Sequence, residues 1–362
     1  MRPMPADTHL FPPPVRPELP PFVKLRDPQT YRPCGLDLVG NANARDYWID
    51  FFSVHIDTML DLGVKAEGDT DDARQRATAC ADELRAKLEA FRADPSAFGP
   101  VSILILDTWR DQILRKHRFF DCFRDQKQAE NEKMLPLLPT VNAELDALDD
   151  DPVQQLRAAV EGVFAGNVFD MGAKQTAALF KDKSPDFLET RSSLKPRPWR
   201  IDDFDSFAGR ATERPYQKVI FFADNAGSDF VLGVVPMVRL LARKGATVVI
   251  ACNEHPSLND VTHNDVAELW PRLGFGGLPV SLVSTGTGEP LIDLRGVSDE
   301  LNAAAADADL VILEGMGRGV ESNLDADLTC DRLNLAMLKD ELIAKTLGGE
   351  VYDCVCRFVR AR

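Results

Sequence analysis

The feature that most constrains the fold is a series of apolar segments after residue 216, each followed by polar or small residues. QKVIFFADNAG, ATVVIACNEHP, PVSLVSTGTG and DADLVILEGMGRG are predicted strands, and EVYDCVCRFV is predicted as a last one. DFVLGVVPMVRLLARKG and VTHNDVAELWPRLG have helical spacing, and LTCDRLNLAMLKDELIAKTLGG is also interpreted as a helix. Strands that alternate with single helices predict a Rossmann-like α/β/α domain with a mostly parallel sheet.

The preceding part of the chain has a helical pattern. ARDYWIDFFSVHIDTMLDLG and DARQRATACADELRAKLEAFRAD place apolar residues three and four apart. The first residues, MRPMPADTHLFPPPVRPELPPF, are rich in proline and favour an extended segment. The sequence therefore predicts an extended arm at 1–22, a mainly helical domain at 23–195 and the α/β/α domain at 196–362.

Charge restricts the partners of this chain. With 57 acidic and 42 basic residues, its formal net charge is −15. Such a surface repels nucleic acid and anionic lipid, so we expect neither as a partner. No apolar run reaches the ~18 residues of a transmembrane helix. The seven cysteines are scattered and form no CxxC pair, which favours a reduced, cytoplasmic protein. The pattern gives no oligomeric state.

Polar residues gather where the predicted strands end. The ends of the first four strands carry Asp224 and Asn225, Asn253 and Asp260, Ser284 and Gly286, and Glu314 and Arg318. Because ligands of open α/β sheets bind beyond the carboxyl ends of the strands, we expect a binding site at this edge.

Asp224, Asn225 and Asp260 offer three oxygen ligands from two neighbouring loops, and such ligands suit Mg²⁺ or Mn²⁺. The alternative is structural, because Asp and Asn are also common at strand ends, and Asp260 could cap the next helix. Arg318 and Lys339 are candidate phosphate ligands, although an isolated basic residue is more often solvated. Gly286 in STGTG allows amides to approach an anion, and an ordinary tight turn explains it equally well.

Several longer motifs carry a resemblance to a known family. They are the DN and NDVT signatures within residues 224–262, EGMGR at 314–318, AGNVFDMGA at 165–173 and RPWRIDDFDSF at 197–207. At these motifs the sequence resembles DUF89, the damage-control phosphatases. The likeness is to the second subfamily, which includes the C-terminal domain of the animal pantothenate kinase 4 protein. It covers roughly residues 21–360.

The resemblance implies a helical domain, an α/β/α phosphatase domain and a divalent metal ion, Mn²⁺, Mg²⁺, Co²⁺ or Ni²⁺. It assigns the metal to Asp224, Asn225 and Asp260, with Asp224, Asp260 and Lys339 as catalytic residues. The implied substrates are small phosphorylated metabolites, with 4′-phosphopantetheine or its oxidised and damaged forms expected for this subfamily of coenzyme A metabolism. The candidate substrate-binding residues are Asn167, Asp170, Arg197, Asn253, Ser284, Gly286, Glu314, Arg318 and Lys339.

One departure from the family pattern follows EGMGR. Family members usually read like DSLKLAVIKN, whereas this chain has DRLNLAMLKD. Lys339 keeps the second lysine, and Asn334 replaces the first. If the first lysine contacts substrate, specificity differs in this chain.

The predicted chemistry is metal-assisted phosphoryl transfer, which requires positioning and charge neutralisation. Water is favoured over a carboxylate as the nucleophile, because Asp224 lacks the DxDx[TV] context of aspartyl-phosphate phosphatases. One alternative is an S-adenosylmethionine-dependent carboxyl methyltransferase, with Glu254 as its acidic residue. Against it, the first strand ends in DNAG rather than in a glycine-rich nucleotide loop. A non-catalytic ligand-binding protein is the other alternative.

Overall fold

The computed structural model describes residues 19–33, 35–168, 187, 191 and 193–362. The chain divides into two compact units, which are treated separately. One contains the described part of Cys34–Phe123, and the other contains Pro20–Pro33 and Arg124–Arg362. The predicted domain boundary at residue 195 does not coincide with this division. Helices between residues 124 and 168 pack against the sheet and group with it.

The first unit is helical. It comprises α1 (Ala42–Ala66), α2 (Asp71–Ala93), the 3₁₀ turn η1 (Pro95–Phe98) and α3 (Ile103–Lys116). Side-chain oxygens of Asn41 and Thr70 accept from main-chain N–H groups at the starts of α1 and α2, which fixes where these helices begin. Phe91 of α2 packs edge-on against Trp109 of α3, with ring centroids 5.7 Å apart. Aromatic contacts of this kind hold the unit together.

The second unit is built on a seven-stranded sheet of order β1-β7-β6-β5-β2-β3-β4. Its strands are β1 (Ile201–Asp202), β2 (Lys218–Phe222), β3 (Thr247–Cys252), β4 (Val280–Ser284), β5 (Leu310–Glu314), β6 (Asp331–Met337) and β7 (Cys354–Val359). All neighbouring pairs are parallel except β6 and β7. The predicted α/β/α class with a mostly parallel sheet is therefore confirmed.

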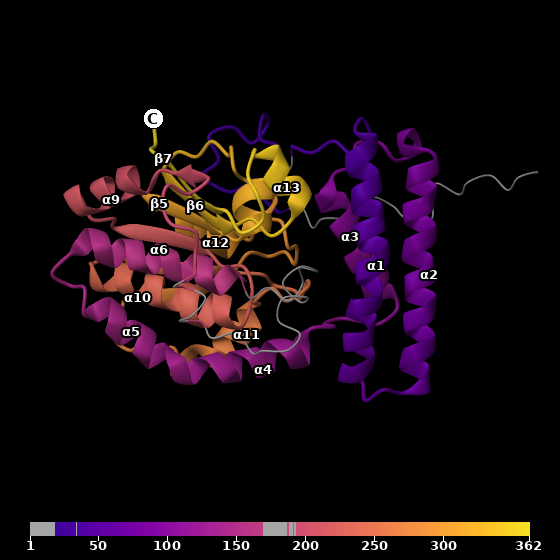
Figure 1. The fold of residues 1–362 in the computed structure, drawn as a ribbon, viewed down its shortest axis with the longest axis horizontal. Coiled ribbons are helices and arrows are strands. Elements are labelled where there is room, and N and C mark those ends of the chain that lie inside the picture. Colours follow the sequence, from indigo (N-terminus) through magenta and orange to yellow (C-terminus); the bar gives the residue numbers. More distant parts are fainter. Residues whose placement is uncertain (1–18, 34, 169–186, 188–190, 192) are drawn as a thin grey trace, which may run out of the picture. The chain divides into compact units, whose positions relative to one another are not determined.

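Helices cover both faces of this sheet (Figure 1). One face packs on α5 (Leu138–Asp146), α6 (Pro152–Val168), α9 (Phe204–Glu213), α10 (Val235–Arg243) and α11 (His263–Leu269). The other packs on α12 (Asp299–Ala305) and on the segment around Phe22, Leu25 and Tyr31. The remaining helical elements are α4 (Arg124–Met134), η2 (Leu135–Leu137), η3 (Asp229–Val234), η4 (Trp270–Arg272), η5 (Met316–Ser322) and α13 (Glu341–Thr346).

The segment LTCDRLNLAMLKDELIAKTLGG was predicted as one helix, and this prediction was wrong. Its first part is the central strand β6, and only Glu341–Thr346 is helical. Leu333, Leu335 and Met337 alternate onto the face covered by α6. Arg332 and Asn334 point to the opposite face, where they bond main-chain carbonyls. The alternation of period two, rather than a helical spacing, determines this element.

Two glycines let α6 approach the first strand-to-helix connection. η3 is a π-helical turn that leads directly into α10. A Cβ at Gly166 of α6 would lie 2.8 Å from the Cα of Asp229, and one at Gly233 would lie 3.2 Å from the Cα of Val163. Close packing at these positions brings the end of α6 beside the residues that follow β2.

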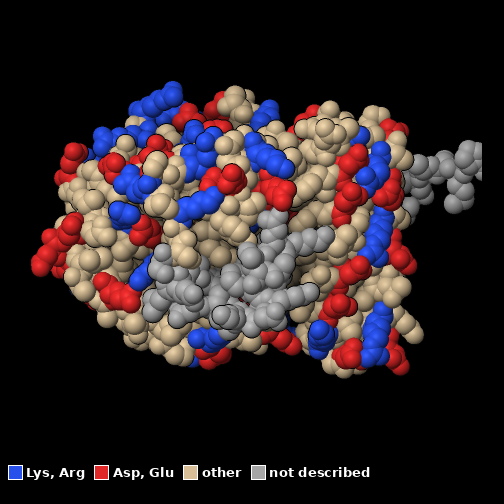
Figure 2. Space-filling model, in the orientation of Figure 1, with Lys and Arg blue, Asp and Glu red and all other residues tan. Residues whose placement is uncertain are grey.

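Within the described residues, no helix is both long and apolar enough to cross a membrane. On the face of the molecule drawn in Figure 2, acidic and basic side chains are interspersed rather than separated by sign. That face shows no continuous basic surface of the kind that binds nucleic acid.

Candidate active site

Two loops at the carboxyl edge of the sheet are joined by main-chain hydrogen bonds. The loop after β2 carries Asp224 and Asn225, and the loop after β3 carries Asp260. The N–H of Ala226 donates to the carbonyl of Asn259 (2.9 Å), and the N–H of Val261 donates to the carbonyl of Asp224 (2.9 Å). Asn225 and Asp260 thereby form an isolated antiparallel bridge. We predicted from the sequence that these two loops are neighbours, and they are neighbours in the structure.

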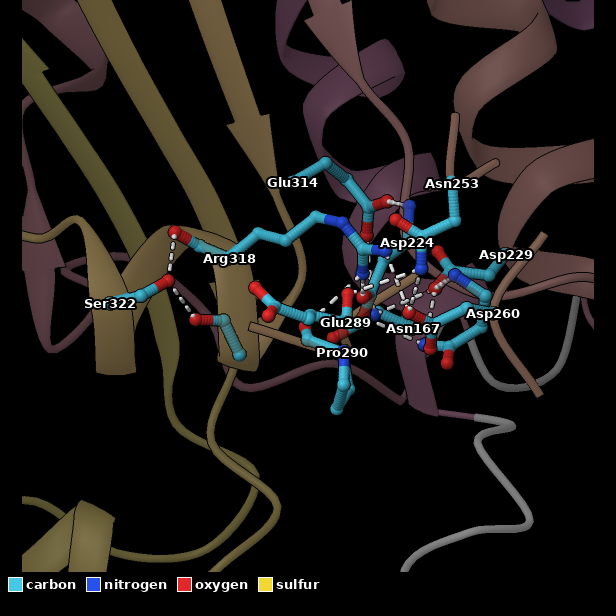
Figure 3. Close-up of polar contacts among 12 residues, drawn as sticks. Asn167, Asp224, Asp229, Asn253, Asp260, Glu289, Pro290, Glu314, Arg318 and Ser322 are labelled. Atoms are coloured by element: carbon cyan, nitrogen blue, oxygen red, sulfur yellow. Dashed lines mark hydrogen bonds and ion pairs between the residues drawn. The ribbon is translucent and has the colours of Figure 1, made fainter. Parts of the chain in front are cut away.

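A cluster of three buried carboxylates lies at this edge (Figure 3). Asp224 follows β2, Asp229 begins η3 and Glu314 ends β5. Their side chains offer oxygen atoms that all lie within 4.8 Å of one another. The three residues are 6%, 1% and 0% exposed, respectively. Three carboxylates this close and this deeply buried require compensating positive charge or protons.

Side-chain amide groups donate hydrogen bonds to the oxygens of this carboxylate cluster. Asn225 donates its Nδ2 to Asp224 (2.8 Å) and to Asp229 (3.0 Å). Asn167, at the end of α6, donates its Nδ2 to Asp229 (2.7 Å) and to Glu314 (3.2 Å). The main-chain N–H of Asp224 donates to Glu314 at 2.8 Å. These bonds orient the carboxylates without neutralising them.

One oxygen of the cluster lacks a hydrogen-bond partner among the described residues. Oδ1 of Asp229 is buried and accepts no hydrogen bond, whereas Oδ2 of the same carboxylate accepts from Asn167. A buried, unpartnered carboxylate oxygen costs free energy unless a cation or donor meets it. The donor set of carboxylate and amide oxygens fits a hard divalent ion.

Burial and mutual repulsion shift the protonation of the cluster. Burial, followed by the charge of Asp224, raises the pKa of Asp229 from 3.8 to about 6, against the opposing effect of Lys339. Burial and the charges of Asp229 and Asp224 raise the pKa of Glu314 well above its usual value. A bound cation would favour the ionised form of each.

Arg318 bridges the two loops from a third element. It lies in η5, the π-helical turn after β5, and is 1% exposed. Its guanidinium pairs with Oδ1 of Asp224 and, at 2.6 Å, with Oδ2 of Asp260. Burial alone would lower the pKa of Arg318, but the charges of Asp260 and Asp224 outweigh it and raise the pKa. Arg318 therefore stays charged inside the site.

Gly315 makes this arrangement sterically possible. Its φ of +92° lies in the region that favours glycine. A Cβ at this position would overlap the carboxylate of Asp224. The glycine of EGMGR thus lets β5 and η5 pass directly beside the loop after β2.

The structure decides the local role of Asp260. The N-cap of α11 is Thr262, whose hydroxyl accepts from the N–H of Asp265 in a capping box, so Asp260 does not cap this helix. Asp260 is 2% exposed and accepts from Arg318 and from Nδ2 of Asn253 (3.0 Å). Asn253 therefore belongs to the same group of contacts.

Of the remaining predicted residues, Lys339 lies near the carboxylate cluster and Arg197 pairs with other acids. Lys339 follows β6, is 5% exposed and lies close enough to Asp229 to lower its pKa. Arg197 instead pairs with Asp202 and Asp205, at 2.8 Å each. Asp170 lies outside the described residues.

The glycine-rich loop after β4 uses its amides internally. Ser284 donates its hydroxyl to Glu254, and the N–H of Gly286 donates to the Ser284 hydroxyl at 3.0 Å. The N–H of Thr287 donates to the hydroxyl of Thr285 at 3.4 Å. These contacts describe a closed turn, which is the alternative that the sequence left open for STGTG.

Some residues of the site were not selected from the sequence. Asp229 stands among the polar residues after the first strand, but nothing in its spacing marked it as a third acid of the cluster. Asn131 of α4 is 4% exposed and accepts the N–H of Gly227 at 2.8 Å. Lys127, also in α4, is 1% exposed and pairs with Asp265 at 2.9 Å. Both lie in a highly charged helix, which as a sequence is typical of a solvated surface.

Comparison with known proteins identifies the family. The model of the damage-control phosphatase ARMT1-like domain matches residues 54–355. The chain belongs to this family. A damage-control phosphatase of Arabidopsis thaliana is 38% identical over 94% of the chain and 97% of its own length. Membership and this relative support a phosphatase, as the resemblance of the sequence predicted.

Two further comparisons agree with this membership. A protein of Mus musculus named 4′-phosphopantetheine phosphatase is 30% identical over 92% of the chain and 48% of its own length. A crystal structure of a DUF89 family protein from Pyrococcus horikoshii has a TM-score of 0.58 at 20% identity, covering 87% of this chain and 97% of that one, which supports the fold. The chain spans about two-fifths of the length of the plant pantothenate kinase 2 relatives that it matches.

Proposed function

We propose that this chain is a divalent-metal-dependent phosphatase of small phosphorylated metabolites, with 4′-phosphopantetheine or its oxidised and damaged forms as substrates. The observation that carries the proposal is the buried cluster of Asp224, Asp229 and Glu314, in which one oxygen of Asp229 has no hydrogen-bond partner among the described residues. Family membership and the name of the mouse relative support the choice of substrate.

The proposed metal ligands include Asp224, which belongs both to the predicted set with Asn225 and Asp260 and to the observed carboxylate cluster. A divalent ion held there would neutralise phosphoryl oxygens and lower the pKa of an attacking water. Mn²⁺, Mg²⁺, Co²⁺ and Ni²⁺ remain candidates, since oxygen ligands accept all four. The amides of Asn167 and Asn225 orient the carboxylates for this role.

The chain's own cations serve the phosphoryl group in this proposal. The guanidinium of Arg318 has a planar fork of donors that matches phosphate oxygens. Lys339 contributes a point charge beside the carboxylate cluster. With a net charge of −15, the protein otherwise repels a phosphate ester, so these two side chains and the metal must supply the attraction. Asn253 donates a hydrogen bond to Asp260, and Glu314 accepts one from the main-chain N–H of Asp224.

Arg197, Ser284 and Gly286 have a weaker place in the proposal. Arg197 pairs with Asp202 and Asp205, the hydroxyl of Ser284 donates to Glu254, and the N–H of Gly286 donates to Ser284. The methyltransferase alternative is not favoured, because the carboxylate of Glu254 accepts the Ser284 hydroxyl and the loop amides are occupied. A cytoplasmic location is part of the proposal and is consistent with six free, buried cysteines among the described residues.

The test is phosphate release from a panel of small phosphate esters that includes 4′-phosphopantetheine. Each ester is assayed with each of the four metals and with a chelator. We expect release that depends on metal, is abolished by chelator and falls at least 100-fold in Asp224→Ala. Release that persists in chelator, or no release from folded protein with any metal, would refute the proposed function.

A further inference from the structure

Asn323, directly after η5, lies at the centre of a buried hydrogen-bond network. It is 1% exposed. Its Nδ2 donates to the main-chain carbonyls of Arg318 (3.0 Å) and Ile292 (3.1 Å), and its Oδ1 accepts from the hydroxyl of Tyr31 (2.7 Å). Both ends of the amide are therefore used, and the bonds connect three separate segments of the second unit.

Two further side chains hold the backbone of Asn323 from the sheet. Arg332 and Asn334, both on β6, donate to its main-chain carbonyl, the latter at 3.1 Å. Arg332 also donates to the side-chain oxygen of Asn334 at 2.7 Å, and Asn334 donates to the carbonyl of Gly319 at 2.6 Å. The end of η5 is thus bonded to β6 by side chains rather than by a strand ladder.

The bond between Asn323 and Arg318 has a specific structural meaning. Carbonyls in the last turn of a helix have no intrahelical donor and need another partner. The carbonyl of Arg318 accepts from the side chain of Asn323 at 3.0 Å and from the hydroxyl of Ser322 at 3.3 Å. Because the Arg318 guanidinium must reach Asp224 and Asp260 together, a shift of its main chain would break one of these contacts.

Tyr31 determines which way the amide of Asn323 faces. Its hydroxyl donates to Oδ1, which leaves Nδ2 to face the carbonyl of Arg318. The same hydroxyl accepts the N–H of Leu294 at 3.2 Å, and its nearest acceptor is Oδ1 of Asn323, since the carbonyl of Ile292 lies farther away, at 3.5 Å. Tyr31 is 7% exposed and belongs to the segment Pro20–Pro33, which packs on the α/β unit.

We infer that Asn323 is a positioning residue for Arg318 and that Tyr31 fixes the orientation of the Asn323 amide. The inference rests on the proposed function, because that proposal assigns Arg318 to the phosphoryl group. Among the described residues, Asn323 has no hydrogen bond to the carboxylate cluster, and it acts through the main chain of Arg318.

A double-mutant cycle tests this inference by phosphate release from the best ester of the panel. Asn323→Ala alone should lower kcat/KM about 30-fold, and Tyr31→Phe, which removes one oxygen, about 5-fold. Arg318→Lys keeps the positive charge but loses the fork that needs exact placement. In the Arg318→Lys background, either second substitution should therefore change kcat/KM by less than about 2-fold.

The matched control is Asn302→Ala. Asn302 bonds the same N-terminal segment, donating to the carbonyl of Pro21 (3.1 Å) and accepting the N–H of Val23 (2.7 Å), but it lies on α12. Its loss should leave kcat/KM within about 2-fold of wild type. Should Asn323→Ala fail to fold, as judged by its melting temperature, Tyr31→Phe carries the cycle. Equal losses in the wild-type and Arg318→Lys backgrounds would overturn the inference while leaving the proposed function intact.

The inference also has a readout that needs no catalysis. If the wild type releases no phosphate, the proposed function fails, and the same variants are titrated with inorganic phosphate by calorimetry. Weaker phosphate binding in Asn323→Ala and Tyr31→Phe, absent in the Arg318→Lys background, would support the positioning role. Unchanged phosphate binding in both variants, or no binding by the wild type, would sink it.

Discussion

Replacing Asp229 by Asn should stabilise the metal-free protein. The raised pKa of Asp229, from 3.8 to about 6, means that its ionised form is unfavourable in the folded state. A shift of this size corresponds to roughly 3 kcal/mol at a pH above 6. Asparagine removes the charge, and its oxygen still accepts from Asn167 and Asn225. Its NH₂ group takes the position of Oδ1, the oxygen of Asp229 that has no hydrogen-bond partner among the described residues.

The sign of the pH dependence follows from the direction of this shift. A carboxyl whose folded pKa lies above its unfolded pKa binds more protons when folded, so stability falls as pH rises through that window. Wild type should lose stability relative to Asp229→Asn between about pH 4 and 6, and the difference should be constant above it. In chelator at pH 7.5 we expect the variant to melt several degrees higher than wild type, at about 2–4 °C per kcal/mol.

Adding metal should narrow this difference. An ion at 100 times its Kd stabilises wild type by about 2.7 kcal/mol. If Asp229→Asn weakens the site tenfold, its gain is about 1.4 kcal/mol at the same concentration. Thermal shift assays with chelator and with a Mn²⁺ titration measure both terms in one experiment.

The control for Asp229→Asn is Asp293→Asn. Asp293 is also 1% exposed, but its carboxylate pairs with Arg295 at 2.8 Å. Its replacement should lower the melting temperature, and Mn²⁺ should not change the difference from wild type. If Asp229→Asn were less stable than wild type in chelator, the hydrogen bonds of Asp229 would outweigh its charge. The argument from carboxylate repulsion would then be wrong.

Three other predictions follow from the same contacts. Gly315→Ala should reduce kcat/KM at least 100-fold in the phosphate-release assay, because the added Cβ would overlap the carboxylate of Asp224. Gly245 has a similar φ but open space around it, so Gly245→Ala should leave kcat/KM unchanged and lower the free energy of unfolding by only about 1 kcal/mol. Asn334→Lys should lower the melting temperature by placing a second buried cation beside Arg332, and the double variant Arg332→Ser/Asn334→Lys should recover most of the loss; no recovery would contradict this reading. Burial raises the pKa of Asp107 to about 7, so urea unfolding should show wild type losing stability relative to Asp107→Asn as pH rises from about 4 to 7, and a difference independent of pH would contradict it.

The sequence predicted the sheet well because its parallel strands are buried on both faces. β2, β3 and β5 appear as continuous apolar runs, and each ends at the polar residues of a loop. The strand β6 was missed. Arg332 and Asn334 alternate with Leu333 and Leu335, a period of two that is typical of a strand. The prediction instead extended the pattern of the following helix, Glu341–Thr346, back across these residues. In the structure this segment pairs with both β5 and β7, and its polar side chains bond the carbonyls of Gly319 and Asn323.

The domain boundary was predicted from composition, and composition does not report packing. Helices α4 to α6 are as helical in pattern as α1 to α3, so nothing in the local sequence separates them. In the structure, α6 contributes Val160, Val163 and Phe164 to the core beneath the sheet. The glycines of α6 and η3 that permit this approach were visible in the sequence, but their partners are distant in the chain.

The ionic groups of the site show the same limit of sequence reasoning. Asp224, Asp260 and Arg318 could be selected because each follows a strand at the edge where ligands bind. The sequence could not show that Arg318 already pairs with both acids, or that Asp229 and Glu314 share the other side of Asp224. Asp224 therefore stands between a fixed cation and two further acids. A metal ion near Asp229 and a phosphoryl group near Arg318 would meet at this one carboxylate, which makes Asp224 the residue whose loss should affect metal binding and turnover together.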